Sequence, residues 1–173
     1  MFHVKHRGSQ EFRTCTDRDI DQIIAIGVET YSQTFSGMTS PEIMSQYLAV
    51  AVDRRKIAAE LANPDSLFLS LVVEGELAGY LKVNQNEAQT DLREAEGLEI
   101  ERIYLRKRFQ GRGLGKLLLE KGLEMSREKR KQYAWLGVWE RNTKAIGFYD
   151  RRDSERSAPT ISSWERSGRP TSS

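Results

Sequence analysis

The stretch Gln110-Gly111-Arg112-Gly113-Leu114-Gly115 lies between two segments of different periodicity. Residues 98–105 alternate in the manner of a β-strand, and residues 113–129 repeat their apolar positions at helical spacing. Glycines let a backbone approach an anion closely, and the start of a helix offers unpaired N–H groups and a partial positive charge. Arg112 and Lys116 add full positive charges. We interpret the stretch as a cradle for a pyrophosphate group; a glycine turn that only links strand to helix is the alternative.

Two better-known phosphate-binding motifs do not fit this stretch. A P-loop requires G-x-x-x-x-G-K-[ST], but Gln110 stands at the first glycine and Leu117 at the hydroxyl residue. A dinucleotide-binding fingerprint requires G-x-G-x-x-G, whereas Gly111, Gly113 and Gly115 are spaced by two throughout. The pattern that remains is Q-x-x-G-x-G.

Three segments of the chain carry a resemblance to a known family. They are Leu98-Glu99-Ile100-Glu101-Arg102-Ile103-Tyr104-Leu105, the Q-x-x-G-x-G stretch, and Trp139-Glu140-Arg141-Asn142 followed by Ala145 and Phe148-Tyr149. Together they resemble the GNAT family of acetyl-CoA-dependent N-acetyltransferases over about residues 12–152, and look most like its bacterial spermidine/spermine N-acetyltransferases. The resemblance implies an α/β (mixed α+β) fold, with a central mixed, mostly antiparallel sheet flanked by helices, and acetyl-CoA as cosubstrate.

Length and composition limit the other classes of protein. A chain of 173 residues is expected to form one domain with a substantial core. Its net charge of +2 does not favour nucleic acid or a membrane surface as partner, and the basic residues 128–131 are better read as a solvated helix end than as a nucleic-acid patch. No apolar run is long enough to span a bilayer. The single cysteine, Cys15, excludes an internal disulfide and is typical of a cytoplasmic protein. We expect no metal site, because His3 and His6 lack partner ligands nearby.

Periodicity and cap residues predict the order of elements. We expect a strand, three helices, a hairpin, a polar loop, a strand before the glycine turn, and a helix and a strand after it. The corresponding residues are 11–15 (strand), 16–35, 40–51 and 53–62 (helices), 67–73 and 77–83 (hairpin), 84–97 (loop), 98–105 (strand), 113–129 (helix) and 134–139 (strand). Alternation along residues 98–105 places Arg102 and Tyr104 on the same face as Leu98, and Glu99 and Glu101 on the opposite face.

The two ends of the chain differ from its centre. Residues 1–10 are polar and basic and are interpreted as a loose extension before a domain of residues 11–152. Residues 153–173 are rich in Ser, Arg, Pro and Thr and nearly lack aliphatic side chains, which predicts a disordered tail. The resembling family continues there with two more strands, so we expect the sheet to lack its last strands. A shift of one base in the tail's possible codons restores a sequence suited to a final hairpin, and we hypothesise that the tail is a frameshift product.

The resemblance implies which residues hold the cosubstrate. In the family, backbone N–H groups of the glycine turn grip the pyrophosphate, and the strand before the turn pairs with the pantetheine arm and directs one N–H at the thioester oxygen. An asparagine after the next strand holds the same arm. The implied cofactor-binding residues are Ile103, Tyr104, Leu105, Gln110, Gly111, Arg112, Gly113, Leu114, Gly115, Lys116 and Asn142.

Acetyl transfer to an amine also needs a base and an acid. Glu101 is our candidate base, acting through water, because burial can raise the pKa of a carboxylate toward working pH. Glu99 is the reserve candidate, and an ion pair with a neighbouring Arg or Lys is an equally good interpretation of either glutamate. Tyr149 matches the family's general acid for the leaving thiolate; a core aromatic is the alternative.

Acidic and aromatic side chains around the cleft are expected to attract a cationic acceptor. They are Glu29, Tyr31, Glu99, Glu101, Trp139 and Glu140. The leading hypothesis is a cytoplasmic N-acetyltransferase that acts on a small amine, foremost a polyamine such as spermidine or spermine. The alternatives are a catalytically impaired acyl-CoA-binding protein and an acetyltransferase for a protein or another small amine. A homodimer is left open.

Overall fold

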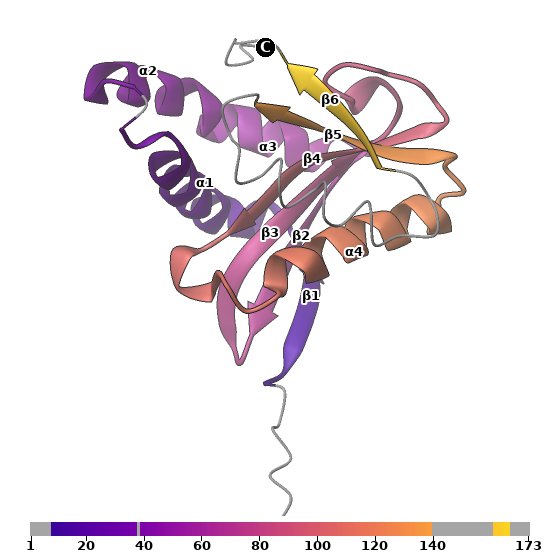
Figure 1. Cartoon of the computed structure of the whole chain (residues 1–173), viewed down its shortest axis with the longest axis horizontal. Coiled ribbons are helices and arrows are strands. Elements are labelled where there is room, and N and C mark those ends of the chain that lie inside the picture. Colours follow the sequence, from indigo (N-terminus) through magenta and orange to yellow (C-terminus); the bar gives the residue numbers. More distant parts are fainter. Residues whose placement is uncertain (1–7, 38, 140–160, 167–173) are drawn as a thin grey trace, which may run out of the picture.

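The computed structural model describes residues 8–37, 39–139 and 161–166 (Figure 1). The described residues form one sheet with helices on both faces. In chain order the elements are β1 (Gln10–Thr14), α1 (Ile20–Phe35), α2 (Pro41–Ala51), α3 (Arg54–Ala62), β2 (Ser66–Val73), β3 (Glu76–Asn84), β4 (Gly97–Leu105), α4 (Leu114–Glu128), β5 (Tyr133–Trp139) and β6 (Ile161–Arg166).

The strands lie side by side in the order in which they occur in the chain, from β1 to β6. Neighbours from β1 to β4 are antiparallel, whereas β4, β5 and β6 run parallel to one another. Parallel neighbours need a crossover connection, which α4 supplies between β4 and β5. The mixed, mostly antiparallel sheet flanked by helices confirms the predicted fold class.

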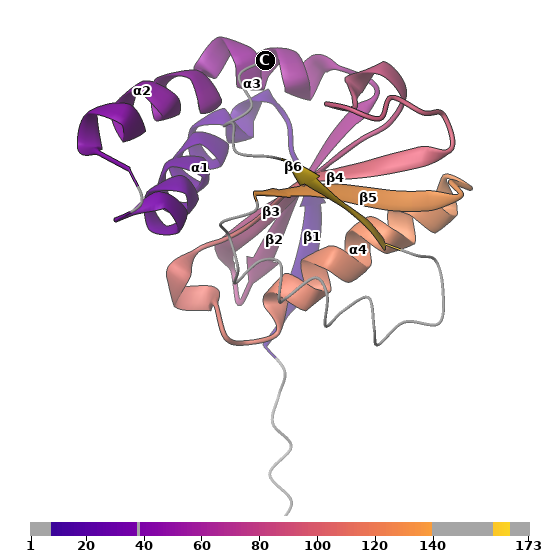
Figure 2. The same cartoon turned by 45° about the horizontal axis from the view of Figure 1, so that its top comes forward.

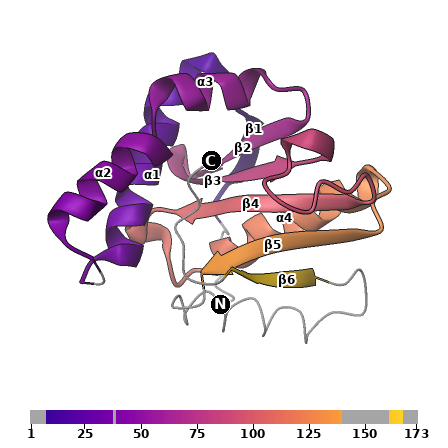
Figure 3. The same ribbon diagram turned by 90° about the horizontal axis from the view of Figure 1, so that it is seen from above.

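The two faces of the sheet carry separate apolar clusters. α4 covers one face, and the fully buried Leu81, Leu98 and Leu118 belong to the cluster beneath it. α1 and α3 cover the opposite face, over a cluster that includes Ile57 and Phe68. Figures 2 and 3 show α4 on one side of the strands and α1 to α3 on the other. In the described ranges, no helix is both long enough and apolar enough to cross a membrane.

Side-chain caps mark the start of three helical segments. Thr16 and Asp19 form a capping box at a short 3₁₀ helix, Asp17–Asp19, which leads directly into α1. In it, Thr16 Oγ1 accepts from Arg18 N–H and Asp19 Oδ2 accepts from Thr16 N–H. Ser40 caps α2 ahead of Pro41 by accepting from a backbone N–H at 3.3 Å. Asp53 caps α3 in the same way at 3.0 Å. These starts confirm the helix boundaries expected from the sequence.

A β-bulge in β4 corrects the predicted division of its side chains. Lys82 of β3 pairs with Arg102, but the next residue, Val83, pairs with Ile100, so Glu101 is an extra residue in the ladder. Simple alternation therefore fails at Glu101. Leu98 and Ile100 share the α4 cluster with Ile103 and Leu105, whereas Tyr104 packs against the α1–α3 cluster and Arg102 bonds Glu60 of α3.

The C-terminal segment also differs from the prediction. Residues 153–173 were expected to be a disordered tail, but within them Ile161–Arg166 form β6 and pair with Ala134–Trp139 of β5. The segment contains two residues that favour strands, Ile161 and Trp164, and the edge of β5 offers unpaired backbone groups that a strand can join. The composition of the whole tail concealed this short strand-forming segment.

Candidate functional site

The glycine turn is a left-handed backbone segment that leads directly into α4. Gly111 and Gly113 have φ angles of +74° and +76°, which only glycine adopts readily. Gly113 is the N-cap of α4, and its carbonyl accepts from Leu117 N–H at 3.2 Å. Helix geometry therefore leaves the N–H groups of residues 114–116 without an intrahelical acceptor. A Cβ built on either Gly111 or Gly113 would meet nothing within 4 Å, so both glycines face open space.

The turn is held in place from the side of the core. The ring of Phe109 is buried, and the guanidinium carbons of Arg108 and Arg112 lie 4.8 Å and 5.5 Å from its centroid. Gln110 donates from Nε2 to the carbonyl of Leu105 at 3.2 Å and so ties the turn to the end of β4. The turn thus combines a fixed backbone, free N–H groups and two nearby cations, which is the chemistry of an anion site.

β4 and β5 are paired at one end only. The described pairing joins Gly97–Glu99 to Tyr133–Trp135 and goes no further along the two strands. On its other edge β4 stays paired with β3 as far as Leu105. Within the described part of the chain, the backbone of residues 100–105 therefore has no partner strand on the β5 side. An extended, amide-containing molecule can add to such an edge and reach the glycine turn that follows it.

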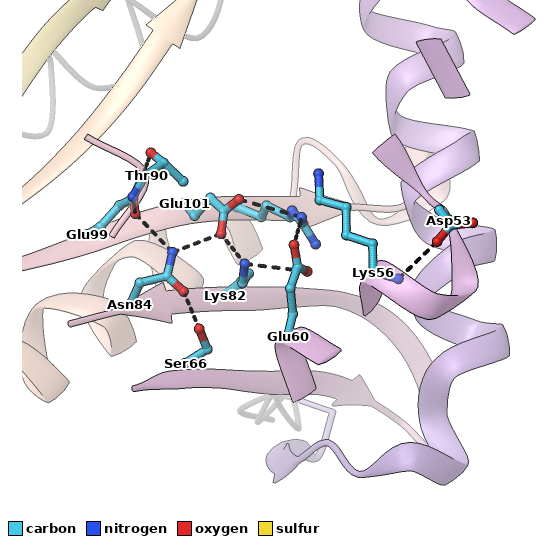
Figure 4. A network of polar contacts seen from close by, with 10 residues as sticks. Asp53, Lys56, Glu60, Ser66, Lys82, Asn84, Thr90, Glu99 and Glu101 are labelled. Atoms are coloured by element: carbon cyan, nitrogen blue, oxygen red, sulfur yellow. Dashed lines mark hydrogen bonds and ion pairs between the residues drawn. The ribbon is translucent and has the colours of Figure 1, made fainter. Parts of the chain in front are cut away.

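A buried polar network lies on the α1–α3 side of this edge (Figure 4). Glu101 makes an ion pair with Lys82 of β3 through Oε2 and lies 3.5 Å from Arg102 through Oε1. Glu60 of α3 closes the ring, at 3.4 Å from Lys82 Nζ and 3.2 Å from Arg102 Nη2. The side chains of Lys82 and Arg102 are only 4% and 7% exposed. Two cations thus neutralise two carboxylates away from water.

The pKa of Glu101 moves in the direction opposite to the prediction. Burial raises it, but the charges of Arg102 and Lys82 and hydrogen bonds from Lys82 and Asn84 outweigh burial and lower the pKa to about 2. A carboxylate with that pKa is ionised at neutral pH and is a weak proton acceptor. The predicted raised pKa is therefore wrong, and the ion-pair interpretation of Glu101 is correct.

Glu99 has a different environment although it lies two residues away. It is 2% exposed, and it accepts hydrogen bonds from the Asn84 amide, from Thr90 N–H and from the Thr90 hydroxyl. All three donors are neutral. Burial raises the pKa of Glu99, and the negative charge of Glu101 adds to that effect, while the three hydrogen bonds oppose it. The carboxyl with the raised pKa is therefore the reserve candidate.

Comparison with known proteins agrees with this geometry. The sequence model of the acetyltransferase (GNAT) family matches residues 31–153, more than half of the chain. The chain belongs to the GNAT family.

A relative supports the same assignment, and a solved structure shares the fold. An uncharacterized N-acetyltransferase of Lactobacillus delbrueckii subsp. lactis is 47% identical over 137 residues, which is 79% of either chain. A spermidine N(1)-acetyltransferase of Thermoplasma acidophilum is 25% identical over 147 residues, covering 82% of this chain and 85% of that protein. The crystal structure of PaiA N-acetyltransferase from Thermoplasma acidophilum, in complex with coenzyme A, superposes with a TM-score of 0.72 at 23% identity and covers 83% of this chain and 88% of that one.

In this GNAT chain, the predicted cofactor residues fall at two adjoining places. Ile103, Tyr104 and Leu105 form the end of β4, on the strand whose β5 side is unpaired. The residues from Gln110 to Lys116 form the turn and the first turn of α4. Asn142, Glu140 and the general-acid candidate Tyr149 lie outside the described residues, as does the side chain of Trp139 at the end of β5.

The predicted acceptor residues on α1 lie beside β4 and already have partners. Glu29 accepts from Lys107 N–H at 3.2 Å and lies 3.9 Å from Arg106 Nε, so it is not a free acidic group. The ring of Tyr31 contacts Tyr104 of β4 at 5.6 Å between centroids, and also Phe35 and Tyr47. Burial raises the pKa of Tyr47 and of Tyr104, so both phenols stay neutral.

Sequence reasoning missed the partners that fix the two glutamates. Lys82 was counted as part of an apolar hairpin strand, and Asn84 and Thr90 as part of a surface loop. A lysine inside an otherwise apolar strand is a usable signal, since a buried charge needs a partner. The contact of Thr90 with Glu99 has no such signal in the sequence. Over the described ranges, no cluster of His, Cys, Asp or Glu could hold a metal ion.

Proposed function

We propose that this GNAT protein transfers an acetyl group from acetyl-CoA to a primary amine. The observation that carries the proposal is the β4 edge. Among the described residues it has no partner strand on the β5 side beyond Glu99, and it ends at the left-handed glycine turn. Free N–H groups at the start of α4 would bind the pyrophosphate, assisted by Arg112 and Lys116. Backbone groups of residues 103–105 would pair with the pantetheine arm. The bound cosubstrate supplies the activated acetyl group.

The remaining groups of this chain have assigned roles in the proposal. A β4 N–H would stabilise the charge that develops on the thioester oxygen. The ionised Glu101, at the bulge, would hold Lys82 and Arg102 beside the β4 edge. Asn142 would hold the pantetheine arm and Tyr149 would protonate the leaving thiolate, both by resemblance to the family. We also propose a cytoplasmic location, which agrees with the buried free thiol of Cys15.

For the acceptor we propose a polyamine such as spermidine or spermine. The support is the resemblance, the spermidine N(1)-acetyltransferase relative, and the aromatic rings of Tyr31 and Tyr104 beside the β4 edge. Lys82 and Arg102 neutralise Glu60 and Glu101 from within the protein. The negative charge left for a second or third ammonium group is therefore small, so monoamines and a peptide amine belong in the same experiment.

The test is thiol release from acetyl-CoA across a panel of amines, with coenzyme A binding measured separately by calorimetry. We expect release with at least one primary amine and a loss of about 10²-fold or more in Tyr149→Phe. Coenzyme A binding without release for every amine would favour an acyl-CoA-binding protein. Absence of coenzyme A binding would remove the proposal.

A further inference from the structure

Asn84 contacts both glutamates of β4 at the point where β4 and β5 part. Its Nδ2 donates to Glu99 Oε2 at 2.9 Å and to Glu101 Oε2 at 2.8 Å. Ser66 Oγ donates to Asn84 Oδ1 at 2.8 Å and so fixes which side of the amide points at the carboxyl groups (Figure 4). Asn84 is fully buried. The two hydrogens of the Asn84 amide are therefore donated to different carboxyl groups, one to Glu99 and one to Glu101.

We propose that Asn84 is a positioning residue for the transfer reaction. Asn84 holds Glu99 and Glu101 together as one unit, in which Glu101 keeps its charge and Glu99 accepts the proton of the acceptor amine. The inference rests on the proposed acetyltransferase function. It assigns the base to Glu99, whose backbone pairs with Trp135 in the last described bridge between β4 and β5. The unit therefore lies where the free β4 edge begins.

The charges around the pair decide which carboxyl takes the proton. The charged groups that contact the unit are Lys82 from β3 and Arg102 from β4, and Glu60 from α3 contacts the same two cations. Both cations contact Glu101, and the described contacts of Glu99 are the neutral amide and the backbone and hydroxyl of Thr90. A second negative charge beside Glu101 is unfavourable. Burial also raises the pKa of Glu99.

The proton balance of the step is simple. One N–H bond of the ammonium group breaks, the electron pair stays on nitrogen, and an O–H bond forms at Glu99 through a water molecule. The neutral amine then forms the C–N bond as the C–S bond breaks, and the thiolate is protonated. Thr90 is exposed to solvent and its hydroxyl contacts Glu99, so it offers the way by which the proton leaves. The net reaction releases one proton for each acetyl group transferred.

The experiment measures the pH dependence of kcat at saturating amine in Asn84→Asp and in a matched control, Asn86→Asp. Asn86 also donates its amide to a carboxylate, Asp65 Oδ1 at 3.1 Å, but it lies outside the pair. We expect Asn84→Asp to move the acidic limb upward by about one pH unit, because a third negative charge raises the pKa of the unit. We expect the control to keep the wild-type profile. Coincident profiles for Asn84→Asp and wild type would overturn the proposal.

A second variant and a second measurement test the proposal even if Asn84→Asp does not fold. Thr90→Val removes a hydrogen bond from Glu99 at an exposed position, and it should move the limb upward by about half a pH unit. Carboxyl ¹³C NMR of labelled glutamate, with Glu99→Gln to assign the signal, should show Glu99 titrating above Glu101 and at the pH of the kinetic limb. If the acidic limb of kcat and the NMR titration of Glu99 fall at different pH values, the proposal is refuted but the acetyltransferase function is not. Absence of thiol release by the wild type with every amine refutes both.

Discussion

Replacement of Gly113 by alanine tests whether the backbone of the turn, and not only its charge, binds the coenzyme. Gly113 has a φ of +76° and caps α4. An L-residue in that region costs about 1–2 kcal/mol, and the new Cβ projects into the open space at the free N–H groups of the helix. Loss of one charge-assisted hydrogen bond costs about 1.5–3 kcal/mol. We therefore expect coenzyme A affinity to fall by about 10- to 100-fold, measured by titration calorimetry.

Gly75 provides a matched control for that substitution. It lies in the turn between β2 and β3, has a φ of +80°, and a Cβ built on it would also meet nothing within 4 Å. Gly75→Ala should therefore lose about 1–2 kcal/mol of stability, as Gly113→Ala does, but should bind coenzyme A as the wild type does. Urea denaturation gives the stability of both variants. If both bind coenzyme A equally well while folded, the turn does not bind the pyrophosphate and the argument is refuted.

Three further predictions concern the sheet and its polar network. Glu101→Gln should destabilise the protein by about 3 kcal/mol at pH 7 in urea denaturation, because it leaves Lys82 buried beside a neutral amide. The low folded pKa of Glu101, about 2 against a usual 4.5, stabilises the wild type by about 3 kcal/mol above pH 4.5. This contribution should disappear as the pH falls toward 2, and Glu101→Gln should show a flatter pH dependence over that range. Gly122→Ala places a Cβ 2.9 Å from Ile100 Cδ1 and should cost about 1–3 kcal/mol by overpacking, seen as a lower Tm; an unchanged Tm would show that α4 can move off the sheet freely.

Local rules predicted most of the fold, because the relevant residues are close in sequence. Thr16, Ser40 and Asp53 each cap a helix within three residues of their own position, and glycine at positions 111 and 113 permits the positive φ angles of the turn. The helix starts and the turn were therefore predictable from the local sequence, whereas the fold class was predicted from the resemblance to the GNAT family.

The chemistry of the two glutamates was not predictable in the same way. Whether Glu99 or Glu101 has the raised pKa depends on Lys82 and Arg102, and the side that Arg102 faces depends on a bulge. A bulge is a property of strand register, which two strands fix together. No pattern within residues 98–105 indicates the bulge. The alternation rule therefore placed Arg102 on the same face as Leu98, which is wrong.

The bulge at Glu101 connects the geometry of the coenzyme edge to the charge of the site. Before the bulge, Glu99 pairs with both neighbouring strands; after it, β4 pairs only with β3 in the described part of the chain. The extra residue turns Arg102 and Tyr104 toward α1 and α3, on the side of Lys82. Without the bulge, continued alternation would direct the Arg102 guanidinium at the apolar α4 cluster, where a lone charge is costly. One register shift thus holds the ion pairs on one face and the apolar support of α4 on the other, beside a free backbone edge.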